Sequence, residues 1–90
     1  MNDIMALSLR EPWLEFIVQG RKRWEFRLFR LGEEMIPFDV LLCSAKQYNR
    51  AQEMCARSLG IDPEVERIYK TRLGMARCVA TVTQILPAEE

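Results

Sequence analysis

The stretch SLREPWLEFIVQGRKRWEFR, residues 8–27, changes its hydrophobic period halfway along, and this change decides the fold. Its first half places apolar residues at helical spacing behind Pro12, and proline suits the first turn of a helix because its missing N–H is not needed there. Gly20 is suited to end that helix, since glycine readily adopts a left-handed conformation. After Gly20 the pattern alternates with a period of two. The stretch therefore predicts a helix over residues 12–19, a sharp turn and a strand over residues 22–29.

The two tryptophans of this stretch are expected in the core. Trp13 shares a helix face with Phe16 and Ile17, and Trp24 points away from Glu25 in the alternating strand. A core position therefore suits both indoles better than stacking on a base.

Three further segments have the patterns of strands. Residues 5–9 alternate as a half-buried strand, whereas residues 38–45 are apolar on both faces, which is typical of a central, covered strand. Residues 75–86, after Gly74, are β-branched and alternating.

Two helices are expected between the last two strands. Residues 46–60 end on Gly60, and residues 62–72 begin with the capping residue Asp62 followed by proline. The expected buried stripes are Tyr48, Ala51 and Cys55 in the first helix and Val65, Ile68 and Tyr69 in the second. The element order predicts one α+β domain over residues 1–90, built on a small, curved, mixed sheet.

Charge is unevenly distributed along a neutral chain. The chain has 13 basic and 13 acidic residues, yet residues 10–30 carry six basic side chains against three acidic ones, and residues 31–70 carry seven acidic against five basic. Such segregation predicts a local positive patch that binds phosphate weakly. It falls short of the strongly basic composition of a dedicated nucleic-acid binder, which leaves room for a small nucleotide-like ligand.

Composition also excludes several classes of chemistry. The chain has no histidine, which removes Ser-His-Asp and Cys-His nucleophilic systems and most transition-metal sites, so we expect no metal and no cofactor. The three cysteines, Cys43, Cys55 and Cys78, fit neither a disulfide framework nor zinc spacing and are interpreted as buried, reduced packing residues. Without a secretory leader or an apolar run of about 18 residues, a cytoplasmic protein with no membrane partner is expected.

The stretch that decides the fold resembles the opening of ASCH domains, which belong to the PUA-like β-barrel superfamily. The resemblance rests on Pro12 and Trp13 and on a Gly-x-Lys-x-x-Glu-x-Arg signature. The signature residues here are Gly20, Lys22, Glu25 and Arg27. The segments PFDVLLCSAK and GMARCVATVTQI also fit the family's later strands, so the resemblance covers roughly residues 6–86. It implies a small PUA-like mixed or antiparallel β-barrel with two to three flanking helices, and binding of RNA or a nucleotide.

The resemblance and the alternating pattern together predict a ligand site. Lys22 follows the turn, while Glu25 and Arg27 share a strand face, where a carboxylate held by cations can accept from a base and arginine can donate to phosphate. The expected ligand contacts are Arg10, Trp13, Lys22, Glu25 and Arg27, and the expected phosphate contacts are Arg21, Arg23 and Arg30.

Two alternatives to a binding module stay open. The first is a hydrolase of RNA or a modified nucleoside, with Lys22 as base and Glu25 as partner. ASCH amidohydrolases that act on acetylated cytidine use a threonine nucleophile, and Glu25 occupies its place, so we expect no catalysis of that type. The second is a protein-interaction module that uses an open sheet edge. Because related domains continue for at least one more strand beyond residues 75–86, a homodimer that completes the sheet is a further expectation.

Overall fold

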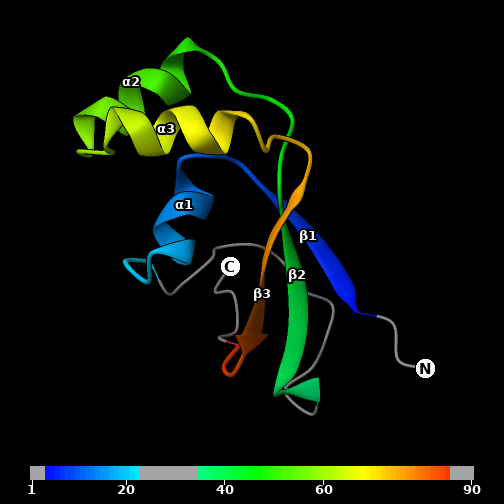
Figure 1. Ribbon diagram of the computed structural model, residues 1–90. Helices are drawn as coiled ribbons and strands as arrows, with labels where there is room; N and C mark the ends of the chain where they lie inside the picture. The colour runs from blue at the N-terminus through cyan, green and yellow to red at the C-terminus, as the bar shows by residue number, and fades with distance from the viewer. Residues whose placement is uncertain (1–3, 23–34, 86–90) are drawn as a thin grey trace, which may run out of the picture.

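A mixed three-stranded sheet forms the centre of the molecule (Figure 1). The computed structural model describes residues 4–22 and 35–85. Strand β1 (Met5–Leu9) pairs in parallel with β2 (Phe38–Ser44), and β2 pairs antiparallel with β3 (Ala76–Val82). The predicted central position of residues 38–45 is confirmed, because β2 lies between the other two strands.

The described strands form an open sheet. Strands β1 and β3 are its edges, and three strands are too few to close a β-barrel around packed side chains. The α+β class and the mixed pairing are confirmed, but the barrel that the resemblance implies is not formed by the described residues. The strand expected over residues 22–29 lies outside the described residues from position 23 onward.

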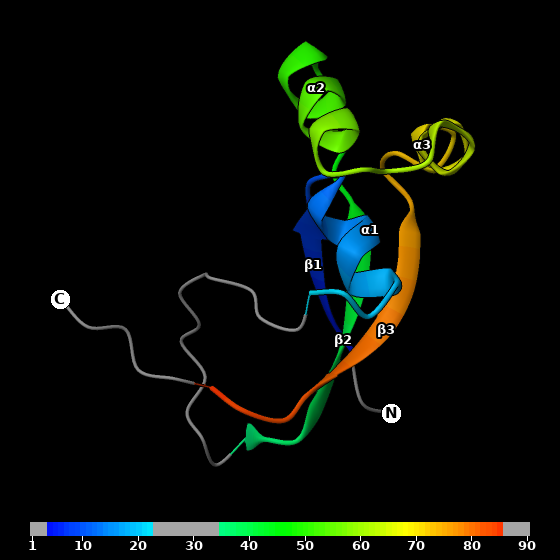
Figure 2. The ribbon, with the colours of Figure 1, turned by 90° about the vertical axis from the view of Figure 1, so that its left-hand side faces the viewer.

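Helix α1 (Trp13–Val18) packs on one face of this sheet, as Figure 2 shows. Its Leu14 is fully buried in a core cluster with Leu9, Val40 and Leu42, the inward-facing residues of β1 and β2. The expectation that Trp13 lies in the core is wrong, because the indole is 38% exposed. With Leu14 facing the sheet, the helical rotation of about 100° per residue turns Trp13 outward.

Gly20 ends this helix as predicted. Its φ is 77°, its N–H donates to the Ile17 carbonyl over 2.9 Å, and the N–H of Arg21 donates to the Phe16 carbonyl over 2.8 Å. These are the two bonds of a Schellman motif, which needs a left-handed residue at this position. The turn redirects the chain sharply before Lys22 and places Arg21 beside the helix.

Helices α2 (Arg50–Ser58) and α3 (Pro63–Lys70) lie beyond one end of the sheet (Figures 1 and 2). Asn49 and Gln52 form a reciprocal capping box at the start of α2, and Asp62 caps α3 with its carboxylate 2.7 Å from the Glu64 N–H. A second core cluster joins both helices to α1 and contains Phe16, Ala56, Ile61 and Tyr69.

Two of the predicted helix stripes need correction. Tyr48 precedes α2, and the buried residues of that helix are Gln52 and Ala56, whereas Ala51 is exposed. In α3 the isoleucine of the predicted stripe, Ile68, is 44% exposed, while Tyr69 is buried as expected. Each shift has the same cause: the buried polar residues Gln52 and Glu66 occupy core-facing positions that a hydrophobicity pattern assigns to apolar ones.

We predict that the packing of α1 depends far more on Leu14 than on Val18. Replacement of Leu14 by Ala removes a fully buried side chain and should lower the free energy of unfolding by about 2–5 kcal/mol. Replacement of Val18 by Ala should change the free energy of unfolding by less than about 0.5 kcal/mol, because Val18 is 44% exposed on the same helix. Denaturant unfolding of both variants measures this, and equal losses would contradict the described orientation of α1.

Candidate functional site

The predicted ligand contacts that the structure describes surround α1. Arg10 and Trp13 are exposed at its start, Arg21 is exposed just past its end, and Lys22 is half-buried beside Arg21. Glu25 and Arg27 lie outside the described residues, as do Arg23 and Arg30. The convergence of Lys22 with Glu25 and Arg27 in one cleft therefore stays a prediction.

Lys22 occupies the place that the Gly20 turn predicts. Its backbone N–H donates to the Phe16 carbonyl over 3.1 Å, which fixes the start of the following segment against α1. Next to it, the Arg21 guanidinium lies 4.7 Å from the centroid of the Phe16 ring, a cation–π arrangement. The turn therefore presents two basic side chains at the end of α1.

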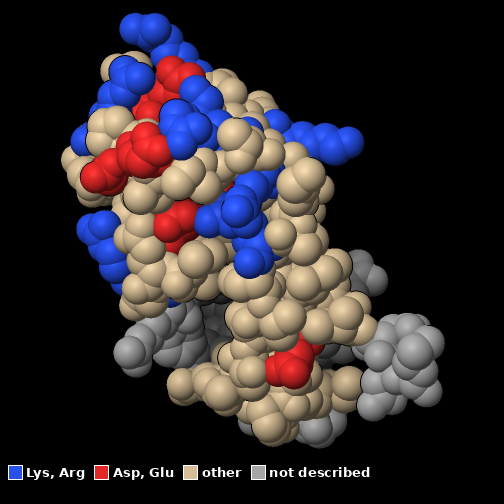
Figure 3. Space-filling view, in the orientation of Figure 1, with Lys and Arg blue, Asp and Glu red and all other residues tan. Residues whose placement is uncertain are grey.

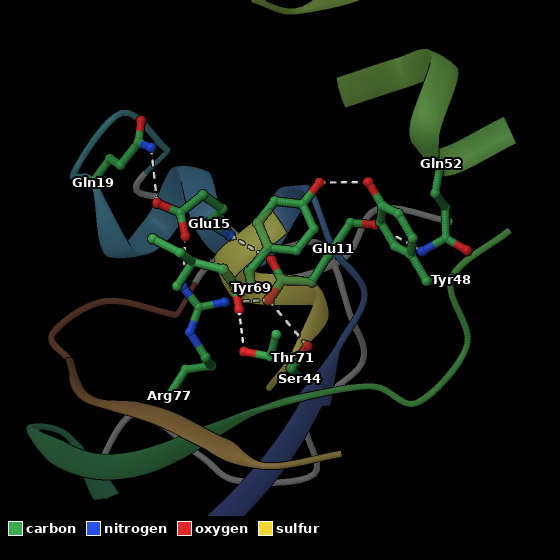
Figure 4. Close-up of polar contacts among 10 residues, drawn as sticks. Glu11, Glu15, Gln19, Ser44, Tyr48, Gln52, Tyr69, Thr71 and Arg77 are labelled. Atoms are coloured by element: carbon green, nitrogen blue, oxygen red, sulfur yellow. Dashed lines mark hydrogen bonds and ion pairs between the residues drawn. The ribbon is translucent and has the colours of Figure 1, made fainter. Parts of the chain in front are cut away.

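A buried carboxylate lies at the other end of α1. Glu11 is fully buried in the turn between β1 and α1, and one of its oxygens accepts the Glu15 N–H over 3.0 Å. That N–H belongs to the first turn of α1, where backbone donors lack helical partners, so Glu11 acts as a cap. The second oxygen accepts from Ser44 Oγ at 3.0 Å, at the end of β2. Figure 4 shows Ser44 and Glu15 on either side of this carboxylate.

Arg77 neutralises Glu11 from the edge strand. One guanidinium nitrogen of Arg77 pairs with the carboxylate of Glu11, and the other lies 2.5 Å from Glu15 Oε1 (Figure 4). The Arg77 side chain is only 9% exposed. Arginine presents its donors as a planar fork, so a single side chain can hold both carboxylates.

A β-bulge explains why Arg77 points toward the helix. Leu42 pairs with Cys78 but Cys43 pairs with Ala76, so Arg77 is an extra residue in β3. In a regular strand Arg77 and Cys78 would point to opposite faces. Cys78 packs against the core cluster between the sheet and α1, and the bulge lets Arg77 point to the same side of the sheet.

Gln52 connects α2 to the backbone of Glu11. Its side-chain amide donates to the Glu11 carbonyl over 2.7 Å and to the Gln47 carbonyl over 3.1 Å. We call Glu11, Glu15, Ser44, Gln52 and Arg77 the buried polar cluster. It connects the β1–α1 turn, α1 and α2 with the end of β2 at Ser44 and the start of β3 at Arg77.

Burial dominates the electrostatics of the cluster. Desolvation raises the pKa of Glu11 above its usual 4.5, and the Arg77 charge and the hydrogen bonds from Ser44 and the Glu15 N–H offset this only in part. In the described residues no buried side-chain nitrogen or oxygen lacks a hydrogen-bond partner. The cluster is therefore fully satisfied from within, which favours a structural role for it over direct contact with a ligand.

A pair of tyrosines extends the polar contacts toward α3. Tyr48 Oη donates to Glu66 Oε2 over 2.7 Å and lies 2.5 Å from Tyr69 Oη, so Tyr69 is the donor in that contact. Burial is the main cause that raises the pKa of both phenols, that of Tyr69 to about 12. Neither phenol is a phenolate near neutral pH, which excludes them as general bases there.

The thiols and acids of the described part offer no further reactive centre. Cys43, Cys55 and Cys78 are free and half-buried, less buried than expected, and burial raises the pKa of the Cys78 thiol. Within residues 4–22 and 35–85, no three His, Cys, Asp or Glu side chains gather as metal ligands do. None of the helices described there is long and apolar enough to cross a membrane.

Sequence reasoning missed the buried polar cluster, although two signals for it exist. Arg77 is a lone cation in an otherwise apolar strand segment, and such a residue requires a partner if it is buried. Glu11 and Glu15 are four residues apart and flank Leu14, so they lie on the buried side of α1. The bulge that brings these residues together has no glycine or other marker in the sequence.

We predict a pH dependence of stability that arises at Glu11. Because the pKa of its carboxyl is higher in the folded state, the folded protein holds this proton over a pH range in which the unfolded chain has lost it. The contribution of Glu11 to stability should therefore be greatest below pH 4.5 and should fall as pH rises through the raised pKa. The measurement is the free energy of unfolding of the wild type minus that of Glu11→Gln, taken between pH 4 and 8. This value should fall as pH rises, and a value that rises with pH would contradict the direction of the pKa shift.

Comparison with known proteins identifies the family. The family model described as ASCH domain matches residues 7–90, nearly the whole chain. Comparisons with curated proteins and with solved structures give no significant match. The match begins in β1 and includes α1, the Gly20 turn and the buried polar cluster, so the chain belongs to the ASCH domain family.

Proposed function

We propose that the protein is a binding module for RNA or a nucleotide-like ligand, held beside α1 by Lys22 together with Glu25 and Arg27. Membership of the ASCH family supports this class, because that domain is commonly linked to RNA binding. The charge of the described surface supports it independently.

Selective burial of acids is the observation that carries the proposal. The described residues include seven acids, of which Glu11, Glu15 and Glu66 are buried. They also include ten bases, none of which is fully buried. The described surface therefore exposes mainly positive charge, which attracts phosphate, while the six acids and three bases outside the described residues complete the neutral total of the chain. Figure 3 shows one face, on which Lys and Arg side chains gather over the half that holds the helices.

The end of α1 is the part of this surface best suited to an anionic ligand. Arg21 and Lys22 are adjacent there, and the Schellman motif fixes the backbone of both through bonds to the Phe16 carbonyl. Ordered cations lose less conformational freedom on binding than flexible ones do. Arg27, two residues from Glu25 in sequence, would add a planar donor fork for phosphate while Glu25 accepts from a base.

We predict that Lys22→Ala weakens RNA binding without unfolding the protein. Affinity for a fluorescent single-stranded RNA, measured by anisotropy, should fall several-fold at 50 mM salt, and the slope of log K against log salt should decrease by about 0.7, because one phosphate contact is lost. Stability should change by less than about 0.5 kcal/mol. Arg50→Ala is the matched control, since Arg50 is an exposed cation at the start of α2, away from the end of α1, and should keep both affinity and slope.

Two results would count against the proposal. If RNA, DNA and free nucleotides all fail to bind at 50 mM salt, the protein is not a module of this class. If Lys22→Ala lowers the melting temperature strongly and leaves the affinity unchanged, Lys22 has a structural role and the ligand lies elsewhere.

A further inference from the structure

Trp13 is exposed although the residues on both sides of it are buried. Its neighbours Glu11, Pro12, Leu14 and Glu15 are all buried, whereas Trp13 itself is 38% exposed. The rest of Trp13 is covered, and other large apolar residues of the described part, such as Met54 and Met75, are more exposed. Exposure alone therefore does not mark Trp13 as a ligand contact, but it leaves part of a large aromatic surface open to stacking.

The backbone around Trp13 is held firmly in place. The preceding Glu11 is bound through both carboxylate oxygens and its carbonyl, and the following Leu14 is fully buried in the core under α1. The indole thus projects from a fixed segment, and an aromatic side chain has few rotamers to lose on binding. Trp13 is a pre-organised flat surface.

Exposed cations precede Trp13 in the chain and follow α1. Arg10 lies just before the turn that leads into α1, Trp13 is the first residue of that helix, and both are exposed. Arg10 is exposed and has no ion pair among the described residues. Arg21, also exposed, lies at the other end of α1, a helix of six residues that spans about 9 Å.

From this arrangement we infer that Trp13 stacks on one unpaired base of a single-stranded nucleic acid, while Arg10 and Arg21 contact phosphates to either side of it. The indole offers stacking to any base, and the two arginines supply the charge complementarity. A base inside a duplex has both faces covered by its neighbours, so only an unpaired one can stack in this way. The inference rests on the proposed function and narrows its ligand class to single strands.

The test compares three ligands of equal length with three variants. The ligands are a 12-nucleotide single-stranded RNA, the same sequence as a duplex, and a strand of the same charge whose nucleotides lack bases. The variants are Trp13→Ala, Trp13→Phe and Met54→Ala, the last being a control for loss of an exposed apolar side chain, because Met54 on α2 is 59% exposed. Thermal unfolding of each variant verifies the fold.

Trp13→Ala should weaken binding of the single strand by about 5- to 150-fold, the range for loss of one stacked base. Trp13→Phe should restore most of it, and Met54→Ala should match the wild type. The strand without bases should bind more weakly than RNA and should not distinguish Trp13→Ala from the wild type.

Other outcomes distinguish failure of base stacking on Trp13 from failure of nucleic-acid binding itself. If single strand and duplex bind equally, with normal salt dependence and no effect of Trp13→Ala, stacking is overturned while phosphate-led binding stands. If a polyglutamate peptide of equal charge competes as well as RNA and its binding also depends on Trp13, the surface binds acidic protein segments and the inference fails. If no nucleic acid binds at all, the proposed function fails, and this inference fails with it.

Discussion

The contact between the buried Glu11 carboxyl and Arg77 is the interaction on which the rest of the structure depends. Burial of a charged carboxylate is costly, and here Arg77, Ser44 and the Glu15 N–H are the partners that offset this cost in part. Each partner comes from a different element. The need to satisfy one carboxylate therefore fixes the positions of α1, β2 and β3 relative to one another.

The same interaction determines what the surface presents. With Glu11 and Glu15 held inside, the exposed side of the β1–α1 turn carries Arg10 and Trp13. The Schellman motif around Gly20 then places Arg21 and Lys22 at the far end of a short helix. Among the described residues three acids are buried and no base is, so this part of the surface is mainly basic, and this is the physical basis of the function proposed for the protein.

Local features of the fold could be predicted from the sequence, and features that depend on distant partners could not. Alternation in Met5–Leu9, the Gly20 turn and the cap at Asp62 are each determined by a few adjacent residues, and all three are confirmed. Trp13 was misplaced because hydrophobicity alone does not say which of two adjacent apolar residues, Trp13 or Leu14, faces the sheet. The buried polar cluster escaped prediction because Arg77 and Glu11 are 66 residues apart in sequence and meet only through a bulge.

A double-mutant cycle between Glu11 and Arg77, measured by denaturant unfolding, tests the central role of this contact most directly. Arg77→Met leaves the buried Glu11 and Glu15 without their cation, and Glu11→Gln leaves Arg77 paired with Glu15 alone. Loss of one partner of a buried pair typically costs about 3–5 kcal/mol. The double variant should cost less than the sum of the two single changes by about 1–3 kcal/mol. The exposed pair Glu64 and Arg67, treated in the same way, should show a much weaker coupling because water screens it. Additive losses at Glu11 and Arg77, with no coupling beyond that of the exposed pair, would contradict the central role of this interaction.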